Sequence, residues 1–392
     1  MDFLEAHCEY NGKIIENYGE NSKLTKEKCS SSLTLCEINN ILYYEHSNCS
    51  GKNGTTITTT EGKWIEDEEK PINNWVKFGT YKTDNTVVRG YLTTFDDNDF
   101  EKVSFQKTFS TMKECEADKN YNNSCTQVTY WKAGDPIYWR IIRTNADGSI
   151  RLLYAGNDVN GNEAHLGVSS YGKAYYSDVE YTDETFLEIY DPLNAGYKYG
   201  TSGSLESNRT NENDSEIKTY IDTWYENNLT SYTNYLSNDA IYCNDRGLAS
   251  GSTYSSTNPF NFKAYDRLST NKTPTYDCTN SQDAFSGSNA EAKLKYPIAL
   301  ITADESAYAS KWLSNCGWTM TPYGFIQGFS FMYAVNSDGY FESGYSVPIS
   351  NSAGVVLPLS VRPATSLKSC VTWKSGDGSR NNPYEIEMNG GC

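Results

Sequence analysis

Apolar and polar residues along this chain mainly follow the short runs and alternations that are typical of β-strands. Two apolar runs, Tyr138–Thr144 and Ser149–Tyr154, are joined by Asn145-Ala146-Asp147-Gly148. An Asp-Gly pair supplies the positive φ of a tight turn, so these runs are predicted to form a β-hairpin. Other predicted strands are a pair in Thr34–Glu45 turning at Asn39-Asn40, one in Gly51–Trp64, those near Trp75–Phe78 and Val87–Leu92, Pro297–Ile301, Val361–Ser369, Val371–Trp373 and, after the Gly376-Asp377-Gly378 turn, Tyr384–Met388.

Two helices interrupt this β-pattern. Ser215 is a suitable N-cap for a helix over Glu216–Leu229, and Thr302-Ala303-Asp304-Glu305 fits a capping box directly after the strand Pro297–Ile301. One face of the first helix is a stripe of the kind that usually packs into a core. A single turn of helix is also expected in Thr111–Asp118. The residues of the stripe are Ile217, Tyr220, Ile221, Trp224 and Asn228.

The stretch from Trp318 to Ala364 differs from the rest of the chain in its composition. It opens with a large aromatic residue and a Pro-containing turn, and it continues through residues rich in Tyr, Phe, Ser, Asn, Asp and Gly. Such a mixture is typical of binding loops, because Tyr gives contact area at low entropic cost and the small polar residues adapt to a partner. A nucleophile or a set of metal ligands is not recognisable in it. We therefore predict a ligand surface over Ser330–Asn351.

Individual roles follow from residue type. Trp318 and Pro322 are expected to fix the turn, and Arg362 to hydrogen-bond backbone or carboxylate groups underneath the surface. Because side chains alternate along a strand, about half of the candidate contacts can face outward. The candidate apolar anchors are Tyr333, Tyr340, Phe341 and Tyr345, and the candidate polar contacts are Ser330, Asn336, Asp338, Glu342 and Ser343.

Length and composition limit the class of protein. The chain has 392 residues, which suggests about two to three domains, and its 32 Tyr and 8 Trp are typical of an ordered protein. The net charge of −17 argues against binding to nucleic acid or to anionic lipid. The segment Glu66–Lys70, followed by Pro71, is expected to be a solvated boundary. We predict a Cys-rich β module over 1–63, a β-rich support domain over 64–131 and a ligand-binding domain over 132–392, with a long polar insertion at Asn157–Asn213.

Eleven cysteines are scattered through the chain without the spacing of a zinc site. This distribution favours disulfides and an oxidising compartment. The predicted bridges are Cys115–Cys125, Cys243–Cys278 and Cys370–Cys392, with Cys316 or Cys8 left unpaired. The sequence shows neither a signal peptide nor a transmembrane run, so either a leader or a membrane anchor has been removed or the protein is cytoplasmic. The cysteine pattern favours removal, and we therefore expect an extracellular or cell-surface protein.

Seven collinear segments from Gly134 onward resemble bacterial, largely gut-associated, secreted or surface proteins with a C-terminal C-type-lectin-like domain. The resemblance implies that residues 132–392 form this domain, with the surface between the Trp318 turn and Val361–Ala364 as its ligand site. In some such proteins a diversity-generating retroelement varies that surface. The chain reads GVVLPLSVRPA over Gly354–Ala364, which has extra residues where the family often reads GVRPA. The matching segments are Gly134–Gly156, Glu216–Leu229, Asn238–Arg246, Lys293–Ala309, Trp318–Phe325, Val361–Ser369 and Ser375–Glu387.

Motifs of other activities are missing from the sequence. It contains no phosphate-binding Gly-Lys loop, no dinucleotide fingerprint, no His-Glu-x-x-His and no nucleophile elbow. The acidic loop Thr94–Glu101 lacks the spacing of a calcium loop, and Asp377 is explained by its turn, so a calcium ion is possible without being supported by a motif. The Glu-Pro-Asn and Gln-Pro-Asp tripeptides of calcium-dependent lectins do not occur, and Cys316 and Cys370 lack the surroundings of a formylglycine-generating active site.

The sequence therefore predicts an α+β protein without a cofactor, in which a β-rich, disulfide-bonded N-terminal region precedes a C-type-lectin-like domain with two helices and long loop insertions. The expected function is adhesin- or receptor-like binding of a protein or glycan on another cell or host surface. One alternative is a self-associating subunit of a surface filament or layer. A second is a carbohydrate-active enzyme, because Asp and Glu are plentiful enough to supply a catalytic carboxylate pair.

Overall fold

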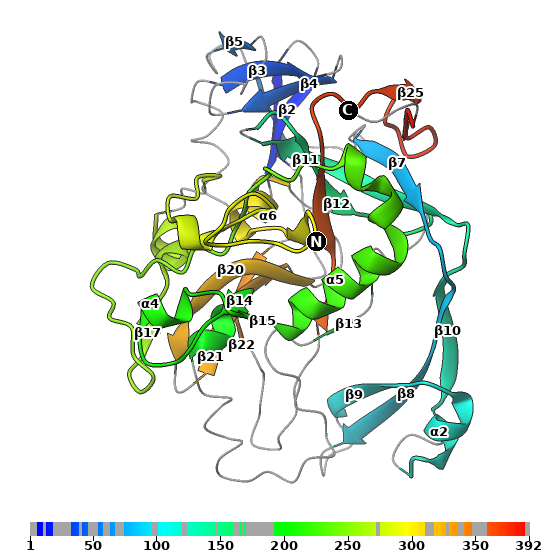
Figure 1. Cartoon of the computed structure of the whole chain (residues 1–392), viewed down its shortest axis with the longest axis vertical. Helices are drawn as coiled ribbons and strands as arrows, with labels where there is room; N and C mark the ends of the chain where they lie inside the picture. Colours follow the sequence, from blue (N-terminus) through cyan, green and yellow to red (C-terminus); the bar gives the residue numbers. More distant parts are fainter. Residues whose placement is uncertain are drawn as a thin grey trace.

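The computed structural model mixes helices and strands, which confirms the α+β class (Figure 1). None of the helices in the part of the chain that it describes is long and apolar enough to cross a membrane. The residues described are 6–10, 13–18, 33–38, 41–45, 54–57, 63–66, 74–95, 101–119, 124–145, 147–159, 165–166, 168–169, 192–271, 275–309, 317–326, 329–335, 341–346 and 359–388.

A seven-stranded sheet forms the centre of the molecule, in the order β19-β24-β12-β11-β7-β26-β25. Its strands pair antiparallel, except that β26 runs parallel to β7. The strand β7 belongs to the segment 64–131, which we expected to be a separate support domain. Backbone pairing of Trp139 with Val76 instead places β7 beside β11, so the expected boundary near residue 131 divides strands of one sheet. The bounds are β7 Trp75–Thr80, β11 Pro136–Thr144, β12 Ile150–Tyr154, β19 Ile298–Leu300, β24 Pro363–Leu367, β25 Trp373–Ser375 and β26 Tyr384–Ile386.

The hairpin predicted from the Asp-Gly turn is confirmed by the pairing of β11 with β12. Gly148 has φ +80°, a conformation that costs glycine little and other residues more. The Asp147 carboxylate accepts a hydrogen bond from the backbone N–H of Ser149 at 3.0 Å and a further one from the hydroxyl of Ser237. The turn is therefore held both locally and by a distant segment.

The long helix α5 (Glu216–Asn228) packs against this sheet (Figure 1). The core between the helix and the sheet is rich in aromatic side chains, and Trp224 of α5 contacts Trp139 and Tyr154 there. Its predicted N-cap is confirmed, since the Ser215 hydroxyl accepts a hydrogen bond from Lys218 N. The predicted stripe is buried except for the half-buried Tyr220. The pattern missed Tyr225, which is fully buried, stacks on Tyr296 with 4.6 Å between ring centroids, and bonds to Thr233 through its hydroxyl.

A second sheet carries the stretch in which we predicted the ligand surface. Its main path is β13-β23-β20-β21-β22, and β17 pairs with β20. Pro322 lies inside β20, so the expected turn at Trp318 and Pro322 is wrong. Proline has no N–H to donate to a ladder, and the register shifts on both sides of Pro322 where it faces Met332. The bounds are β13 Val168–Ser169, β17 Phe260–Asn261, β20 Gly317–Ile326, β21 Phe329–Val335, β22 Phe341–Ser346 and β23 Leu359–Ser360.

An arm extends from the central sheet between β7 and β11 (Figure 1). It consists of β8 (Asn85–Phe95), β9 (Glu101–Phe109), β10 (Thr126–Trp131) and the short helix α2 (Met112–Ala117), and the helical turn predicted there is confirmed. The Cys115–Cys125 disulfide joins α2 to the segment just before β10. The arm thus has its own covalent brace.

The N-terminal region forms two three-stranded sheets, β2-β1-β6 and β4-β3-β5. The strand pair expected in Thr34–Glu45 is confirmed by the pairing of β3 with β4. The bounds there are β1 Ala6–Tyr10, β2 Lys13–Tyr18, β3 Leu33–Ile38, β4 Ile41–Glu45, β5 Gly54–Ile57 and β6 Lys63–Glu66. The remaining elements are β14 Lys198–Tyr199, β15 Asn213–Asp214, β16 Tyr242–Cys243, β18 Ala284–Phe285, α4 Leu205–Asn208 and α6 Ala303–Ala309, with 3-10 helices η1 Pro192–Ala195, η2 Thr230–Tyr235 and η4 Ser281–Asp283 and the π-helix η3 Tyr265–Thr270.

Two of the predicted disulfides, Cys115–Cys125 and Cys243–Cys278, are confirmed. Cys370 is also disulfide-bonded, and its expected partner, Cys392, lies outside the described residues. Cys316, the expected unpaired cysteine, lies outside them as well.

Removing a buried side chain from α5 tests this packing. Ile221→Ala is expected to lower the free energy of unfolding by about 2–5 kcal/mol, because Ile221 is fully buried and its loss leaves a cavity. Asn227→Ala, on the exposed face of the same helix, should change it by less than about 0.5 kcal/mol. Urea unfolding of both variants measures the difference, and equal stabilities would contradict the packing described here.

Candidate functional site

Two of the predicted ligand contacts are buried. Ser330 is 1% exposed and Tyr333 is 0% exposed. The Tyr333 ring packs with Leu268 of η3 and Ala303 of α6, and its hydroxyl bonds to the hydroxyl of Ser269 at 2.8 Å. These two residues are therefore removed from the predicted surface, because elements distant in sequence cover this part of β21.

The other predicted contacts lie on β22 or beyond the described residues. Glu342, Ser343 and Tyr345 are on β22, an end strand of the second sheet, where Glu342 faces Ala334 and Tyr345 faces Met332 of β21. The remaining predicted contacts, Asn336, Asp338 and Tyr340, lie outside the described residues.

Arg362 lies between β23 of the second sheet and β24 of the central sheet, and it hydrogen-bonds a backbone group as expected. It is 7% exposed, and its Nε and Nη2 both donate to the backbone oxygen of Tyr154, at 3.3 and 3.0 Å. Burial lowers the pKa of Arg362 to about 10. Trp318, on β20, is 2% exposed and belongs to the main core.

Three half-exposed aromatic rings form a cluster over β20, β21 and η3. Tyr323 meets Tyr265 edge to face with 5.5 Å between centroids, and it meets Phe331 in the same way at 6.4 Å. We call Tyr265, Tyr323 and Phe331 the aromatic cluster. It continues inward to the buried Tyr333, so its rings are positioned by packing from below. Rings held in this way can contact a partner at low entropic cost.

On the other side of η3 lies a small pocket. The π-helix is marked by the hydrogen bond from Asn271 N to Asp266 O, and helices of this type often occur at functional sites. The volume of the pocket is about 20 Å³, room for about one water molecule. Its lining comes from β11, β16, η3, the segment 275–277, α6 and β20: Arg143, Ile241, Cys243, Asp245, Arg267, Thr275, Tyr276, Asp277, Thr302, Asp304, Glu305 and Thr321.

Arg267 holds two carboxylates at this pocket. Its Nε and Nη2 donate to the two oxygens of Asp304 at 2.6 and 2.7 Å, and its Nη1 donates to Asp245 at 2.7 Å. Burial opposes the charge of Arg267 and the charge of Asp304. In Arg267 the carboxylates outweigh burial and raise its pKa, whereas burial is the larger influence on the pKa of Asp304 and raises it. Asp245 has φ +36°, an uncommon conformation outside glycine, so backbone strain is stored beside the pocket.

Glu305 performs two tasks at the start of α6. One oxygen accepts from the Nε atoms of Arg143 and Arg151, at 2.8 and 3.1 Å, and the other accepts from Thr302 N at 2.9 Å. Glu305 N in turn donates to the Thr302 hydroxyl at 3.0 Å, so the predicted capping box is confirmed. Burial would raise the pKa of Glu305, but Arg151 and Arg143 outweigh it and the pKa is lowered.

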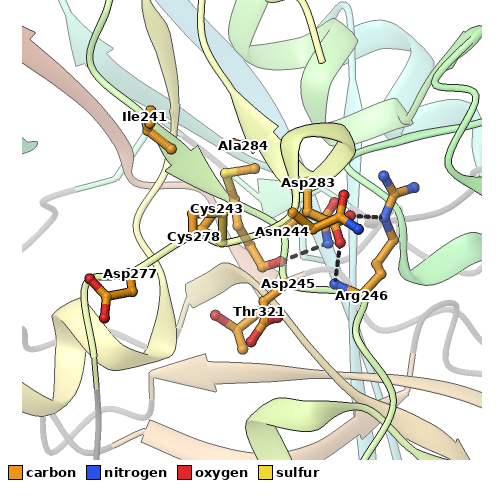
Figure 2. The surroundings of a disulfide bond; sticks show 12 residues. Ile241, Cys243, Asn244, Asp245, Arg246, Asp277, Cys278, Asp283, Ala284 and Thr321 are labelled. Carbon is orange, nitrogen blue, oxygen red and sulfur yellow. Dashed lines mark hydrogen bonds and ion pairs between the residues drawn. A yellow bond between two sulfur atoms is a disulfide. The ribbon is translucent and has the colours of Figure 1, made fainter. Parts of the chain in front are cut away.

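The neighbouring segment Cys243–Arg246 fixes this region to the core (Figure 2). Cys243 is bonded to Cys278, and the buried Asn244 donates to Ala195 O and Met320 O. Arg246 is fully buried, and all five of its side-chain N–H groups have acceptors. The acceptors are Asp283 Oδ1 at 2.6 Å, Lys198 O, Asn208 O, Asn211 Oδ1 and Gln282 O.

Among the described side chains, no group of three or more His, Cys, Asp or Glu residues is placed to hold a metal ion. The buried carboxylates in this described part of the chain, Asp222, Asp283, Asp304 and Glu305, each pair with a cation. Sequence reasoning missed Arg267, Asp245 and Asp304 as a unit. The segments that contain two of them were visible, Asn238–Arg246 as part of the resemblance and Thr302–Glu305 as a capping box, but Arg267 had no signal of its own.

Comparison with protein-family models found no matching family, and comparisons with curated proteins and with solved structures found no match.

The role of Arg246 can be measured by a conservative substitution. Arg246→Lys is expected to lower the free energy of unfolding by about 3–5 kcal/mol, because an ammonium group cannot serve five fixed acceptors and leaves Asp283 poorly paired. Arg209→Lys is the matched control, since Arg209 makes one hydrogen bond to the same carboxylate, and it should cost less than about 1.5 kcal/mol. Chemical denaturation of both variants measures the two losses, and a larger loss for Arg246→Lys identifies Arg246 as a structural anchor. Equal costs would argue against it.

Acid stability tests the pairing of Glu305. Its folded pKa is lowered, so the stability it contributes is present above the ordinary pKa of 4.5 and is lost as the pH falls through the folded value. Glu305→Gln should therefore flatten the fall in unfolding free energy below about pH 4.5 by up to about 1.4 kcal/mol per pH unit. Glu226→Gln, at an exposed ion pair with Lys295, should keep the slope of the wild type. Urea titrations between pH 3 and pH 7 provide the slopes.

Proposed function

We propose that this protein is an extracellular or cell-surface binding protein, adhesin- or receptor-like, built on a C-type-lectin-like scaffold. Its partner is a protein or glycan on another cell or host surface. The observation that carries the proposal is the aromatic cluster of Tyr265, Tyr323 and Phe331, half-exposed rings grouped over the stretch whose composition is typical of binding loops.

The position of the ligand surface differs from the sequence prediction. With Ser330 and Tyr333 buried, the described part of the surface centres on Tyr323 and Phe331. Half-exposed rings that are already packed on one side lose little freedom when a partner covers the other side, and such residues often dominate binding energy. The face of a sugar ring and the apolar side chains of a protein are both suitable contacts for them.

The charges of the domain support binding rather than catalysis. Glycoside hydrolysis needs two carboxyl groups open to the substrate, one of which releases a proton. The buried carboxylates Asp283, Asp304 and Glu305 are instead held in ion pairs with arginines. The disulfides support an oxidising location.

Substitution of the cluster provides the test. The double variant Tyr323→Ala/Phe331→Ala is expected to reduce binding about tenfold or more, because the rings supply the buried contact area. Labelled protein would be applied to a glycan array and, by flow cytometry, to epithelial and bacterial cells. The matched control is Trp373→Ala/Tyr384→Ala. It removes two half-buried rings on β25 and β26 of the central sheet, whose centroids are 5.0 Å apart.

Three results would contradict the proposal. Equal loss of binding in both double variants, at unchanged folding by circular dichroism, would place the contact elsewhere. Concentration-dependent self-association of the wild type at micromolar concentration, abolished by the cluster substitutions, would favour the filament-subunit alternative. Turnover of a glycan that Asp or Glu substitutions abolish would favour the enzyme.

A further inference from the structure

The segment 275–278 closes one side of the small pocket, and we call it the strap. Three contacts tie it to three different elements. Thr275 N donates to the Asp304 carboxylate of α6 at 2.9 Å, the Tyr276 ring faces the guanidinium of Arg143 on β11 at 4.2 Å, and Cys278 is bonded to Cys243 of β16. One of these contacts is the covalent Cys243–Cys278 bond, and the other two are a hydrogen bond and a ring–guanidinium contact.

The two ends of the covalent contact are anchored very differently. Cys243 is followed by Asn244 and Arg246, whose buried hydrogen bonds fix that segment to the core (Figure 2). On the strap, Tyr276 is half-buried and Asp277 is exposed, and Asp277 N donates to the hydroxyl of Thr275 within the strap itself. When the disulfide is broken, the strap is therefore the side that can move.

The Cys243–Cys278 disulfide is also open to reagents. Both of its cysteines are half-buried and can be reached, whereas the other described disulfide joins the half-buried Cys125 to the fully buried Cys115, so only one of its two sulfur atoms can be reached. Thiol–disulfide exchange requires a thiolate to reach a sulfur atom, so exposure decides which bond reacts first. Cys243–Cys278 is expected to react while Cys115–Cys125 remains intact.

We propose that Cys243–Cys278 is a redox latch that keeps the strap closed over the pocket and releases it on reduction by a dithiol. A thiolate of the dithiol attacks one sulfur, forms a mixed disulfide and expels the other cysteine as a thiolate. The second thiol of the reagent then displaces the remaining cysteine. The protein gains two electrons and two protons as two thiols, and the dithiol becomes a cyclic disulfide.

Release of the strap changes the pocket behind it. Asp304 loses the N–H of Thr275, and Arg143 loses the ring of Tyr276, so water reaches the Arg267–Asp304 pair. The Arg246–Asp283 pair and the central sheet do not depend on the strap and keep their contacts. Reduction thus opens a site between η3 and α6 without unfolding the domain.

The test is a graded reduction of the full-length protein with dithiothreitol, followed by iodoacetamide labelling and hydrogen exchange, both read by mass spectrometry. We expect labelling of Cys243 and Cys278 at least about tenfold faster than that of Cys115 and Cys125. Peptides covering 275–280 and the start of α6 should exchange faster in the reduced form, while peptides of β11 and β12 should stay protected.

A substitution on the strap separates the latch from general reactivity. Tyr276→Ala removes the contact with Arg143 and should speed reduction of Cys243–Cys278 about 2- to 10-fold, because the strap opens more often. Tyr384→Ala, a half-buried tyrosine on β26, should leave the rate unchanged. Labelling of Cys243 and Cys278 only together with global exchange of β11 and β12 would overturn the proposal, and so would selective reduction that leaves the 275–280 peptides protected.

Discussion

The buried pair of Arg246 and Asp283 is the interaction on which this domain most depends. Both side chains are 0% exposed, and Arg246 is served by backbone oxygens from two further segments. Removing an arginine from water is costly, and only a complete set of acceptors compensates for it. Since the acceptors belong to residues 198–211 and 282–283, those segments must adopt one arrangement together. The Cys243–Cys278 disulfide and the pocket then take their positions from this arrangement.

Around that anchor, buried ion pairs and partly exposed aromatic rings lie in different places. The charged side chains are drawn inward, where Glu305 caps α6 while holding two arginines and Arg267 links η3 to Asp304 and Asp245. The aromatic rings of Tyr265, Tyr323 and Phe331 are left half-exposed on the other side of η3. A rigid, internally neutralised support beneath rings that are already held in place suits the binding role proposed above.

The elements that the sequence predicted well are those specified by their own neighbours. The hairpin at Asp147-Gly148, the Ser215 cap and the Thr302 capping box depend on residues within four positions of each other, and all three are confirmed. The burial of Tyr333 depends on Leu268 and Ala303, which come from other elements. Pro322 was misplaced for a similar reason, because a register shift within β20 accommodates it.

The candidate site was predictable to a smaller degree. Composition alone pointed to the stretch from Trp318 to Ala364, and Arg362 bonds to a backbone oxygen as expected. The pocket on the other side of η3 joins Arg143, Asp245, Arg267 and Asp304, which are up to 161 positions apart in the chain. Local sequence patterns carry no information about contacts between residues so far apart in the chain. The pairing of these charges is visible only in the fold.

The arm between β7 and β11 has a consequence for how the protein can vary. Its two ends meet where Thr80 pairs with Pro136 and where Tyr81 N and Gly134 N complete a pair of backbone bonds to Asp135 and Tyr81. The base of the arm, where its two ends meet, is therefore closed by the pairing of β7 with β11, and the arm itself is cross-linked by the Cys115–Cys125 disulfide. Trp131 at the end of β10 still packs in the main core, stacked on Tyr81, so this part of the arm is fixed. We expect the part beyond it to tolerate changes of length while β7 and β11 keep their register.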